Sequence, residues 1–570
     1  MSPRWLLSFA LVPVVLGTSL AAQAQAGNAP GVVGHIHVGT TNPNQNTTPS
    51  ATPASGASAL AAADQLFAAH KLPEAAAKYQ AIVKADPSSV RAQVGLIRSY
   101  MMMEKLDEAQ AAAKAALAAL PNSAKLLTTD GDLQFRLGKI PQAERAYVKS
   151  ENLNPKDPEP YLGLARVYRA YSLYRRAYDN LKRAHEIAPT DLPVQLMWFH
   201  SLPPQSQIPA LEAYLGSSST DPQIARSLQP YLAALKKNAA AGSHDCKLVT
   251  RIAQTDTKLF PVQRSGMALG AVGLAVKINK QEVHLALDTG ASGILLGRAA
   301  AERLGLQRLA YQPIIGMGDS GQQGGYTAVA DRIRVGDLEF QDCEVKVTDA
   351  ATPVTGQDGL IGSDVFSSYL IDIDVPSARL RLSQLPKRPN QAAEPASLNT
   401  VSQDQDSAAP AAGAADLPSD TYVAPDMANW TKVYRFRNLL TVPTLVDHTG
   451  PMLFLIDTGS FSNVLSTRAA RDVTQIRSDP RTQVRGMSGS VAQVYRADQA
   501  TLQFGRYEQQ NQDIVTFDLS GISRQAGTEV SGVLGFAMLR ILQIKIDYRD
   551  GLVDFVYDPH HLPKQVKIVN

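Results

Sequence analysis

Two apolar runs in this chain of 570 residues end on the same triplet, Asp-Thr-Gly. Residues Leu285–Ser292 have the sequence Leu-Ala-Leu-Asp-Thr-Gly-Ala-Ser, and residues Phe454–Ser460 have the sequence Phe-Leu-Ile-Asp-Thr-Gly-Ser. A strand that ends on a carboxylate and a glycine turn places an acid at the edge of a hydrophobic core, partly shielded from water. One such triplet occurs by chance about 0.1 times in a chain of this length. A second copy in matched surroundings therefore constrains the fold strongly.

The surroundings of the two triplets match. Each Asp is followed by a Gly-Met pair and later by two apolar residues and a glycine, at nearly equal intervals. The Gly-Met pairs lie 28 and 29 residues after the Asp, at Gly316-Met317 and Gly486-Met487, and the apolar-apolar-Gly triplets end 74 and 78 residues after it, at Leu360–Gly362 and Val533–Gly535. We therefore predict that a whole domain is duplicated within the chain.

This order of motifs resembles the retropepsin-like aspartic proteases over about residues 260–390 and 425–560. A retroviral protease monomer supplies one such Asp, whereas pepsin-like enzymes carry two in one chain. The resemblance implies two mainly β, retropepsin-like domains, predicted here at residues 247–385 and 425–564, that form one site. Period-two alternation of apolar residues on both sides of Asn279-Lys280 also predicts a β-hairpin that leads into the first Asp.

The resemblance also implies a role for each matching residue. Asp288 and Asp457 would be the catalytic pair. Thr289 and Thr458 would lock the two loops together, Gly290 and Gly459 would let the backbones approach closely, and the flap residues Gly316, Met317, Gly486 and Met487 would close over an extended peptide.

Two carboxylates brought together in this way cannot both ionise, so they hold one proton between them. The ionised member takes a proton from a water, which attacks the amide carbonyl of a peptide or protein substrate, while the protonated member donates to the carbonyl oxygen. The predicted activity is that of an aspartic-type endopeptidase, with no cofactor and no metal. Its pH dependence should be bell-shaped and favour acid, because the pair titrates as a unit.

Two departures from the family pattern leave the peptide specificity and the flap assignment open. The flap tips carry Met where pepsin-like enzymes place a Tyr, and Ser363–Phe366 differs from Phe536–Leu539, so the two halves need not be equivalent. An alternative to the endopeptidase is a catalytically inactive, peptide-binding or assembly protein that keeps a degenerate protease fold. A further alternative pairs each domain across two chains of a dimer.

Residues 58–240 are predicted to be helical, because small residues and prolines recur at intervals of 34. The prolines are Pro87, Pro121, Pro155 and Pro189, and the alanines are Ala75, Ala109, Ala143 and Ala177. This pattern resembles tetratricopeptide repeats, with Gly95 and Gly163 at the small position of the first helix and Tyr79 and Tyr147 at the larger packing position. Such an array implies a concave surface for a peptide or a partner protein, and the alternative is a scaffold without a dedicated ligand.

The N-terminus is predicted to direct export. Residues 1–26 are typical of a signal peptide, with Arg4 before an apolar stretch and small residues at the cleavage site, and the alternative is a membrane anchor. Residues 27–57 and 386–424 are rich in small and polar residues and are predicted to be disordered linkers. We expect a periplasmic or secreted protein with no stable membrane span after signal removal. The net charge of +3 gives no indication of nucleic-acid binding.

Two weaker signals remain. Cys246 and Cys343 are the two cysteines of the chain, and in an oxidising compartment they would either form a disulfide or remain as buried thiols. Residues 316–321 have the spacing G-x-G-x-x-G, but a β-like run follows instead of the helix that a dinucleotide site needs. No histidine or cysteine spacing indicates a metal site.

Overall fold

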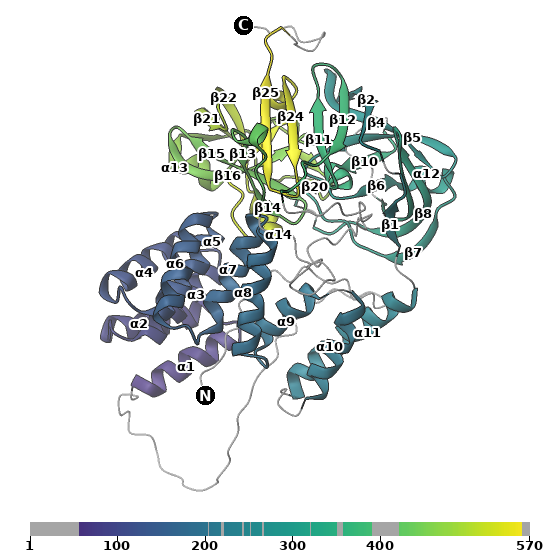
Figure 1. Cartoon of the computed structure of the whole chain (residues 1–570). Helices are drawn as coiled ribbons and strands as arrows, with labels where there is room; N and C mark the ends of the chain where they lie inside the picture. The colour runs from purple at the N-terminus through teal and green to yellow at the C-terminus, as the bar shows by residue number, and fades with distance from the viewer. Residues whose placement is uncertain are drawn as a thin grey trace, which may run out of the picture. The chain divides into compact units, whose positions relative to one another are not determined.

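The computed structural model describes residues 56–202, 204–217, 222–241, 244–250, 252–264, 267–319, 321–349, 357–389 and 421–560. The predicted signal peptide at residues 1–26 lies outside the described residues, as do residues 27–55 of the predicted tether and 390–420 of the predicted linker. The described chain forms two compact units, one within residues 56–167 and 176–240 and the other within residues 168–175 and 241–560. Figure 1 shows both units and labels many of their elements.

The first unit is built from helices that begin at the predicted interval of 34 as far as residue 192, after which the interval is 30. They are α1 (Gly56–Ala68), α2 (Leu72–Ala85), α3 (Val90–Met102), α4 (Leu106–Ala119), α5 (Ala124–Arg136), α6 (Ile140–Leu153), α7 (Pro158–Ala170), α8 (Tyr174–Ile187), α9 (Leu192–Ser201), α10 (Pro204–Gly216) and α11 (Pro222–Ala241). The prolines that recur at this interval lie in the turns after α2, α4, α6 and α8, because proline cannot continue a helix.

Glycine is required where one helix of the array crosses the next. A Cβ atom on Gly95 of α3 would lie 2.4 Å from the ring of Tyr79, and one on Gly163 of α7 would lie 2.3 Å from the ring of Tyr147. Both rings are fully buried, and their hydroxyls donate to Asp64 and Asp132. Glycine and tyrosine therefore form one packing unit that repeats along the array.

Charged side chains also recur at the interval of 34, on the first helix of successive pairs. They are Asp64, Arg98, Asp132 and Arg166. Arg98 has an exposed fraction of 2% and pairs with Glu159 at 2.9 Å, and Arg166 pairs with Asp132 at 2.6 Å. We call these four side chains the charge ladder. It was not predicted from the sequence, although the interval of 34 that locates it is present there. Because a buried charge is costly without its partner, the ladder fixes how the helices stack.

The second unit contains two β-rich halves. The first half comprises β1 (Asp245–Leu248), β2 (Gln254–Lys258), β3 (Phe260–Arg264), β4 (Met267–Ile278), β5 (Gln281–Asp288), β6 (Ile294–Gly297), α12 (Arg298–Arg303), β7 (Gln307–Tyr311), β8 (Gly325–Val335), β9 (Leu338–Thr348), β10 (Gly359–Gly362), η1 (Ser363–Phe366), β11 (Tyr369–Asp374) and β12 (Arg379–Gln384). Its main sheet has the order β1-β9-β6-β10-β5-β4-β8-β7, with β3 on β4. Its first strand, β1, begins at Asp245 and is too short to show alternation in the sequence.

The second half repeats this plan. It comprises η2 (Pro425–Met427), β13 (Thr431–Lys432), β14 (Tyr434–Phe436), β15 (Leu439–Val446), β16 (Thr449–Asp457), β17 (Val464–Ser466), α13 (Thr467–Val473), β18 (Ile476–Ser478), β19 (Arg485–Gly486), β20 (Gly489–Ser490), β21 (Tyr495–Phe504), β22 (Tyr507–Phe517), α14 (Ser520–Ala526), β23 (Gly532–Gly535), α15 (Phe536–Leu539), β24 (Leu542–Asp547) and β25 (Leu552–Tyr557). Its main sheet has the order β14-β15-β16-β23-β17-β22-β21-β18.

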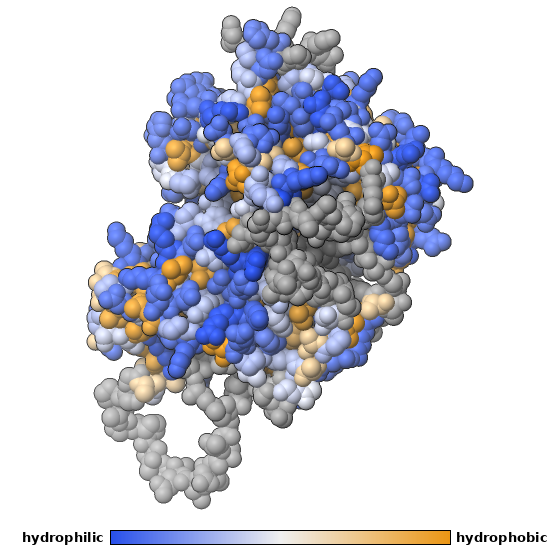
Figure 2. Space-filling view, in the orientation of Figure 1, coloured by the Kyte–Doolittle hydropathy of each residue, from blue (hydrophilic) through white to orange (hydrophobic). Residues whose placement is uncertain are grey.

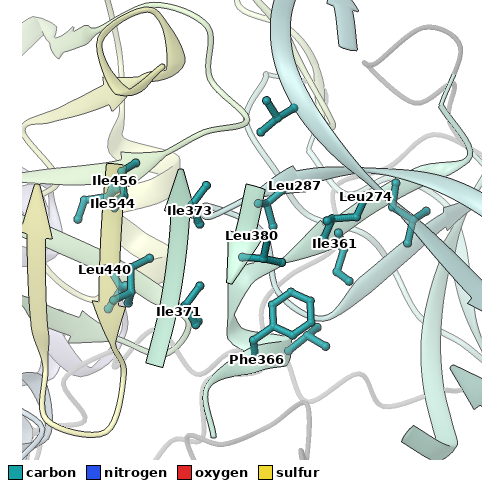
Figure 3. Packing of buried hydrophobic residues seen from close by; sticks show 14 of the residues in the cluster. Leu274, Leu287, Ile361, Phe366, Ile371, Ile373, Leu380, Leu440, Ile456 and Ile544 are labelled. Carbon is teal, nitrogen blue, oxygen red and sulfur yellow. The ribbon is translucent and has the colours of Figure 1, made fainter. Parts of the chain in front are cut away.

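A sheet shared by the two halves joins them, in the order β13-β25-β24-β11-β12-β2. At its centre β11 of the first half pairs antiparallel with β24 of the second, with Ile373 opposite Ile544. Figure 3 shows the core beside this junction, where Ile371 and Ile373 lie among apolar side chains from both halves. The hydrophobic core is therefore continuous across the duplication.

The surface of the chain drawn in Figure 2 is mainly hydrophilic, and its hydrophobic residues are scattered between polar ones. Among the described residues, no helix combines the length and the apolar character that crossing a membrane requires.

Cys246 of β1 and Cys343 of β9 form a disulfide between residues 97 positions apart. The structure thus favours the disulfide over two buried thiols. Because β1 is only four residues long, the bond covalently fixes a strand whose ladder with β9 is short.

We predict that replacing either cysteine by serine lowers the free energy of unfolding of the second unit. A closed loop of this length restricts the unfolded chain by about 4–5 kcal/mol. Urea unfolding of Cys343→Ser and of the oxidised parent measures the difference, and the reduced parent should match the variant. If reduction leaves the free energy of unfolding of the parent unchanged, the prediction is contradicted.

We predict that Gly95→Ala destabilises the helical array by about 1–3 kcal/mol, because the new methyl group overlaps the Tyr79 ring. The matched control is Gly216→Ala at the end of α10, where an added Cβ meets no atom within 4 Å. The melting temperatures of the two variants are compared by thermal unfolding, followed by the circular dichroism signal of the helices. Equal melting temperatures would contradict the packing account.

Candidate active site

Each Asp-Thr-Gly triplet lies where a strand ends beside a second, parallel strand. Asp288 is the last residue of β5 and lies opposite Gly362 of β10, and Asp457 is the last residue of β16 and lies opposite Gly535 of β23. A Cβ on Gly362 would lie 2.6 Å from the carbonyl oxygen of Ala291, and one on Gly535 would lie 2.2 Å from that of Ser462. The apolar-apolar-Gly triplets therefore run directly against the two Asp loops, which we define as Asp288–Gly293 and Asp457–Ser462.

Thr289 and Thr458 connect the two loops through four reciprocal hydrogen bonds. The amide of Thr289 donates to the hydroxyl of Thr458 at 3.1 Å, and the amide of Thr458 donates to the hydroxyl of Thr289 at 3.0 Å. Each hydroxyl donates in turn to a carbonyl of the opposite strand, at 2.8 and 2.9 Å. Both threonines have an exposed fraction of 0%. We call this arrangement the threonine bridge.

The threonine bridge places each carboxylate over the glycine of the other loop. A Cβ on Gly290 would lie 2.8 Å from Cγ of Asp457, and a Cβ on Gly459 would lie 2.3 Å from Oδ2 of Asp288. The amides of Gly290 and Gly459 donate to their own aspartates at 2.9 and 2.8 Å. A side chain at either glycine would push the two carboxylates apart.

Burial, the charge of Asp457 and a side-chain hydrogen bond to Asp457 together raise the pKa of Asp288 well above its usual value. The amides of Gly290 and Ala291 act in the opposite direction and lower this pKa. A hydrogen bond between two carboxyl groups requires a proton on one of them. The environment therefore favours a pair that holds one proton.

The predicted flap residues of the two halves also meet. The amide of Gly316 donates to the hydroxyl of Ser488 at 3.0 Å, and the amide of Ser488 donates to the carbonyl of Met317 at 2.9 Å. A Cβ on Gly486 would lie 2.3 Å from the same carbonyl oxygen, so the absence of a side chain there allows the tips to touch. Gly316, Met317 and Gly318, which begin the stretch with G-x-G-x-x-G spacing, belong to this contact, and a bridge between Ile314 and Gln323 closes its base.

The two flap methionines each reach the opposite half. Met317 packs against an apolar cluster of the second half that contains Leu455 and Val533, and Met487 packs against one of the first half that contains Ala286 and Leu360. These cluster residues lie on the strands that end at the two aspartates and on the strands beside them. Each methionine therefore covers the wall beside the other half's carboxylate.

Three polar residues of the site were not predicted from the sequence. Ser488 connects the flap tips, and Asp364 and Asn463 support the Asp loops from behind. The first copy has Gly318 where the second has Ser488, so the comparison of the two copies gave no signal for this contact. Among the described residues, no group of three His, Cys, Asp or Glu side chains is placed to hold a metal ion.

Comparison with known proteins agrees with this geometry. Residues 274–365 and 442–538 match the family model described as Aspartyl protease, and residues 66–129 match the model described as Tetratricopeptide repeat. The chain therefore carries two tandem retropepsin-like aspartyl protease domains downstream of tetratricopeptide repeats, which confirms the resemblance and the fold class predicted from the sequence. A search of curated proteins gives no match.

Three solved structures are similar to parts of the chain. The aspartic proteinase from Irpex lacteus is 10% identical, with a TM-score of 0.31, and the match covers 54% of this chain and 98% of that one. A thermophilic TPR protein of Thermus thermophilus is 17% identical, with a TM-score of 0.29, and the match covers 32% and 100%. MamA is 20% identical, with a TM-score of 0.21, and the match covers 31% and 96%.

We predict that Thr458→Val lowers the free energy of unfolding of the second unit by about 2–4 kcal/mol, because it leaves the Thr289 amide and the Leu287 carbonyl unpaired in a buried place. Thr458→Ser keeps the hydroxyl and serves as the control. Urea unfolding measures both. If valine and serine are tolerated equally, the threonine bridge does not hold the halves together.

Proposed function

We propose that this protein is an exported aspartic endopeptidase whose single active site is formed by Asp288 and Asp457 of one chain. The observation that carries the proposal is the position of each carboxylate over the other loop's glycine, held by the threonine bridge. These contacts link residues 169 positions apart in one chain. They support a tethered pair and weigh against a site shared between two chains.

The proposed reaction uses only the two carboxyl groups and a water. The carboxylate without the proton accepts a proton from the water, whose oxygen attacks the carbonyl carbon of the scissile amide. The protonated carboxyl donates to the carbonyl oxygen, which gives a tetrahedral diol. The proton taken from water then passes to the leaving nitrogen as the C–N bond breaks, and a hydroxyl of the diol returns a proton to the carboxylate that had donated, which restores the pair with one proton. The amides of Gly290 and Gly459 fix the orientation of the two acids, and the flaps would exclude bulk water.

The helical array is proposed to bind a protein partner or to present protein substrates, since stacked helix pairs offer an extended surface. Export to the periplasm or the exterior is proposed from the signal-like sequence at residues 1–26. The Cys246–Cys343 disulfide supports this proposal, because disulfides persist mainly in oxidising compartments.

We predict that the purified chain cleaves an unfolded protein such as casein between about pH 3 and 8, with a bell-shaped profile. Loss of the shared proton lowers the rate at high pH, and protonation of both acids lowers it at low pH. Asp288→Asn and Asp457→Asn should each reduce cleavage by about 10²–10⁴-fold. Asp472→Asn, at an exposed position on α13, is the matched control.

The outcomes separate the remaining alternatives. Loss in only one Asn variant would mean that the two halves act separately and would overturn the tethered site. A folded parent that cleaves nothing at any pH would favour the peptide-binding protein with an inactive protease fold.

A further inference from the structure

The two Asp loops are held from behind by different chemistry. Behind the first loop, the carboxylate of Asp364 accepts hydrogen bonds from the hydroxyl of Ser292 at 2.8 Å and from the amide of Gly293 at 3.0 Å. Behind the second loop, the side-chain oxygen of Asn463 accepts from the amide of Gly535 at 2.9 Å. The position equivalent to Asp364 in the second copy is Ala537, which has no polar side chain.

Asp364 is tied closely to the strand that neighbours the first aspartate. It lies two residues after Gly362, which faces Asp288 in the parallel ladder and whose amide donates to the carbonyl of Gly293 at 2.8 Å. A Cβ on Gly362 would lie 2.4 Å from Oδ1 of Asp364, so the carboxylate packs on the backbone of that strand. Movement of Asp364 would therefore move the support of Asp288.

Packing alone does not hold this part of the first loop. A cavity of about 20 Å³ borders Gly293 and Ile294 and is also lined by Val365 and by the Cys246–Cys343 disulfide. Gly293 has a φ of 65°, a left-handed conformation that favours glycine and has no side chain to fill that space. The end of the loop is therefore fixed by directional contacts, namely the two hydrogen bonds to Asp364 and the bond from the Gly362 amide to the Gly293 carbonyl.

The residue before Asp364 fixes the same turn to the second half. The hydroxyl of Ser363 lies 2.7 Å from the hydroxyl of Tyr548, and both side chains are buried. Burial raises the pKa of Asp364, while the Gly293 amide and the Ser292 hydroxyl lower it. A partly buried acid with hydrogen bonds to two residues of the loop indicates a role in positioning.

We propose that Asp364 is the positioning residue of the first Asp loop, and that the two catalytic aspartates are therefore supported unequally, Asp288 by a carboxylate and Asp457 by the neutral amide of Asn463. The second support is itself fixed, because the Asn463 amide donates to Gln509 and Asn511 at 3.0 Å each. The expected effect on kcat rests on the proposed function. The hydrogen bonds that hold the two loops, and the effect of removing them on the loops, do not depend on catalytic activity.

Two variants of the same position test the proposal. In Asp364→Ala both hydrogen bonds to the loop are lost, and kcat should fall by about 10–100-fold with KM changed less than about threefold, since misplacement of a reacting group affects the rate more than binding. Asp364→Asn keeps an acceptor for Gly293, and the Ser292 hydroxyl can accept from the new amide. It should restore kcat to within about threefold of the parent. Equal loss in both variants would overturn the proposal.

Hydrogen exchange followed by mass spectrometry gives a readout that needs no catalysis. Asp364→Ala should raise exchange of amides in residues 289–293 and leave residues 458–462 protected, and Asn463→Ala should do the reverse. A variant that raises exchange in both loops equally would show a general structural role and would overturn the proposal. If the chain proves inactive, the exchange result still decides the positioning role, so failure of the proposed function is distinguished from failure of this inference.

Ser292→Ala is a milder variant that tests the proposal if the Asp364 variants do not fold. It removes one of the two contacts and leaves Asp364 and its bond to Gly293 intact. The effects of Asp364→Ala should recur but be smaller, with kcat lowered by about 3–10-fold and hydrogen exchange raised in the first loop only. No change in either measurement would overturn the proposal.

Discussion

The threonine bridge is the interaction on which the rest of the second unit depends. Its hydrogen bonds are made between the halves, so neither half can satisfy Thr289 or Thr458 alone. Unpaired buried polar groups cost free energy, and the two halves are therefore driven to dock in one register. The shared sheet formed by β11 and β24 and the continuous core reinforce the same register. The carboxylate pair is a product of this docking and exists in neither half by itself.

A duplicated domain in one chain can become unequal, whereas a symmetric dimer must use the same residues twice. The polar contacts behind the Asp loops differ, with Asp364 on one side and Asn463 on the other. The flap tips differ too, since the Ser488 hydroxyl of one flap accepts from the Gly316 amide of the other. The Asp-Thr-Gly triplets themselves have remained the same. Residues that position the acids and cover them are thus among those that differ between the halves.

The helical array follows a separate physical logic. Its interval of 34 sets where Gly95 and Tyr79 meet and where Arg98 finds its acidic partners. Both contacts join different helix pairs, Tyr79 of α2 to Gly95 of α3 and Arg98 of α3 to Glu159 of α7, so each pair depends on the others for its stability.

The sequence alone determined the duplicated β domain, the helical repeats and the identity of the acids, because these depend on local patterns: an apolar run that ends on Asp-Thr-Gly, and small residues at a fixed interval. It also showed that Ser363–Phe366 and Phe536–Leu539 differ, which is where Asp364 was found. Tertiary structure decided that Asp288 and Asp457 face each other's glycines, that Cys246 and Cys343 pair, and that Ser488 joins the flaps. These contacts join residues about 100–170 positions apart. The docking of whole sheets decides which distant groups meet, and the local spacing of residues in the sequence carries no information about that docking.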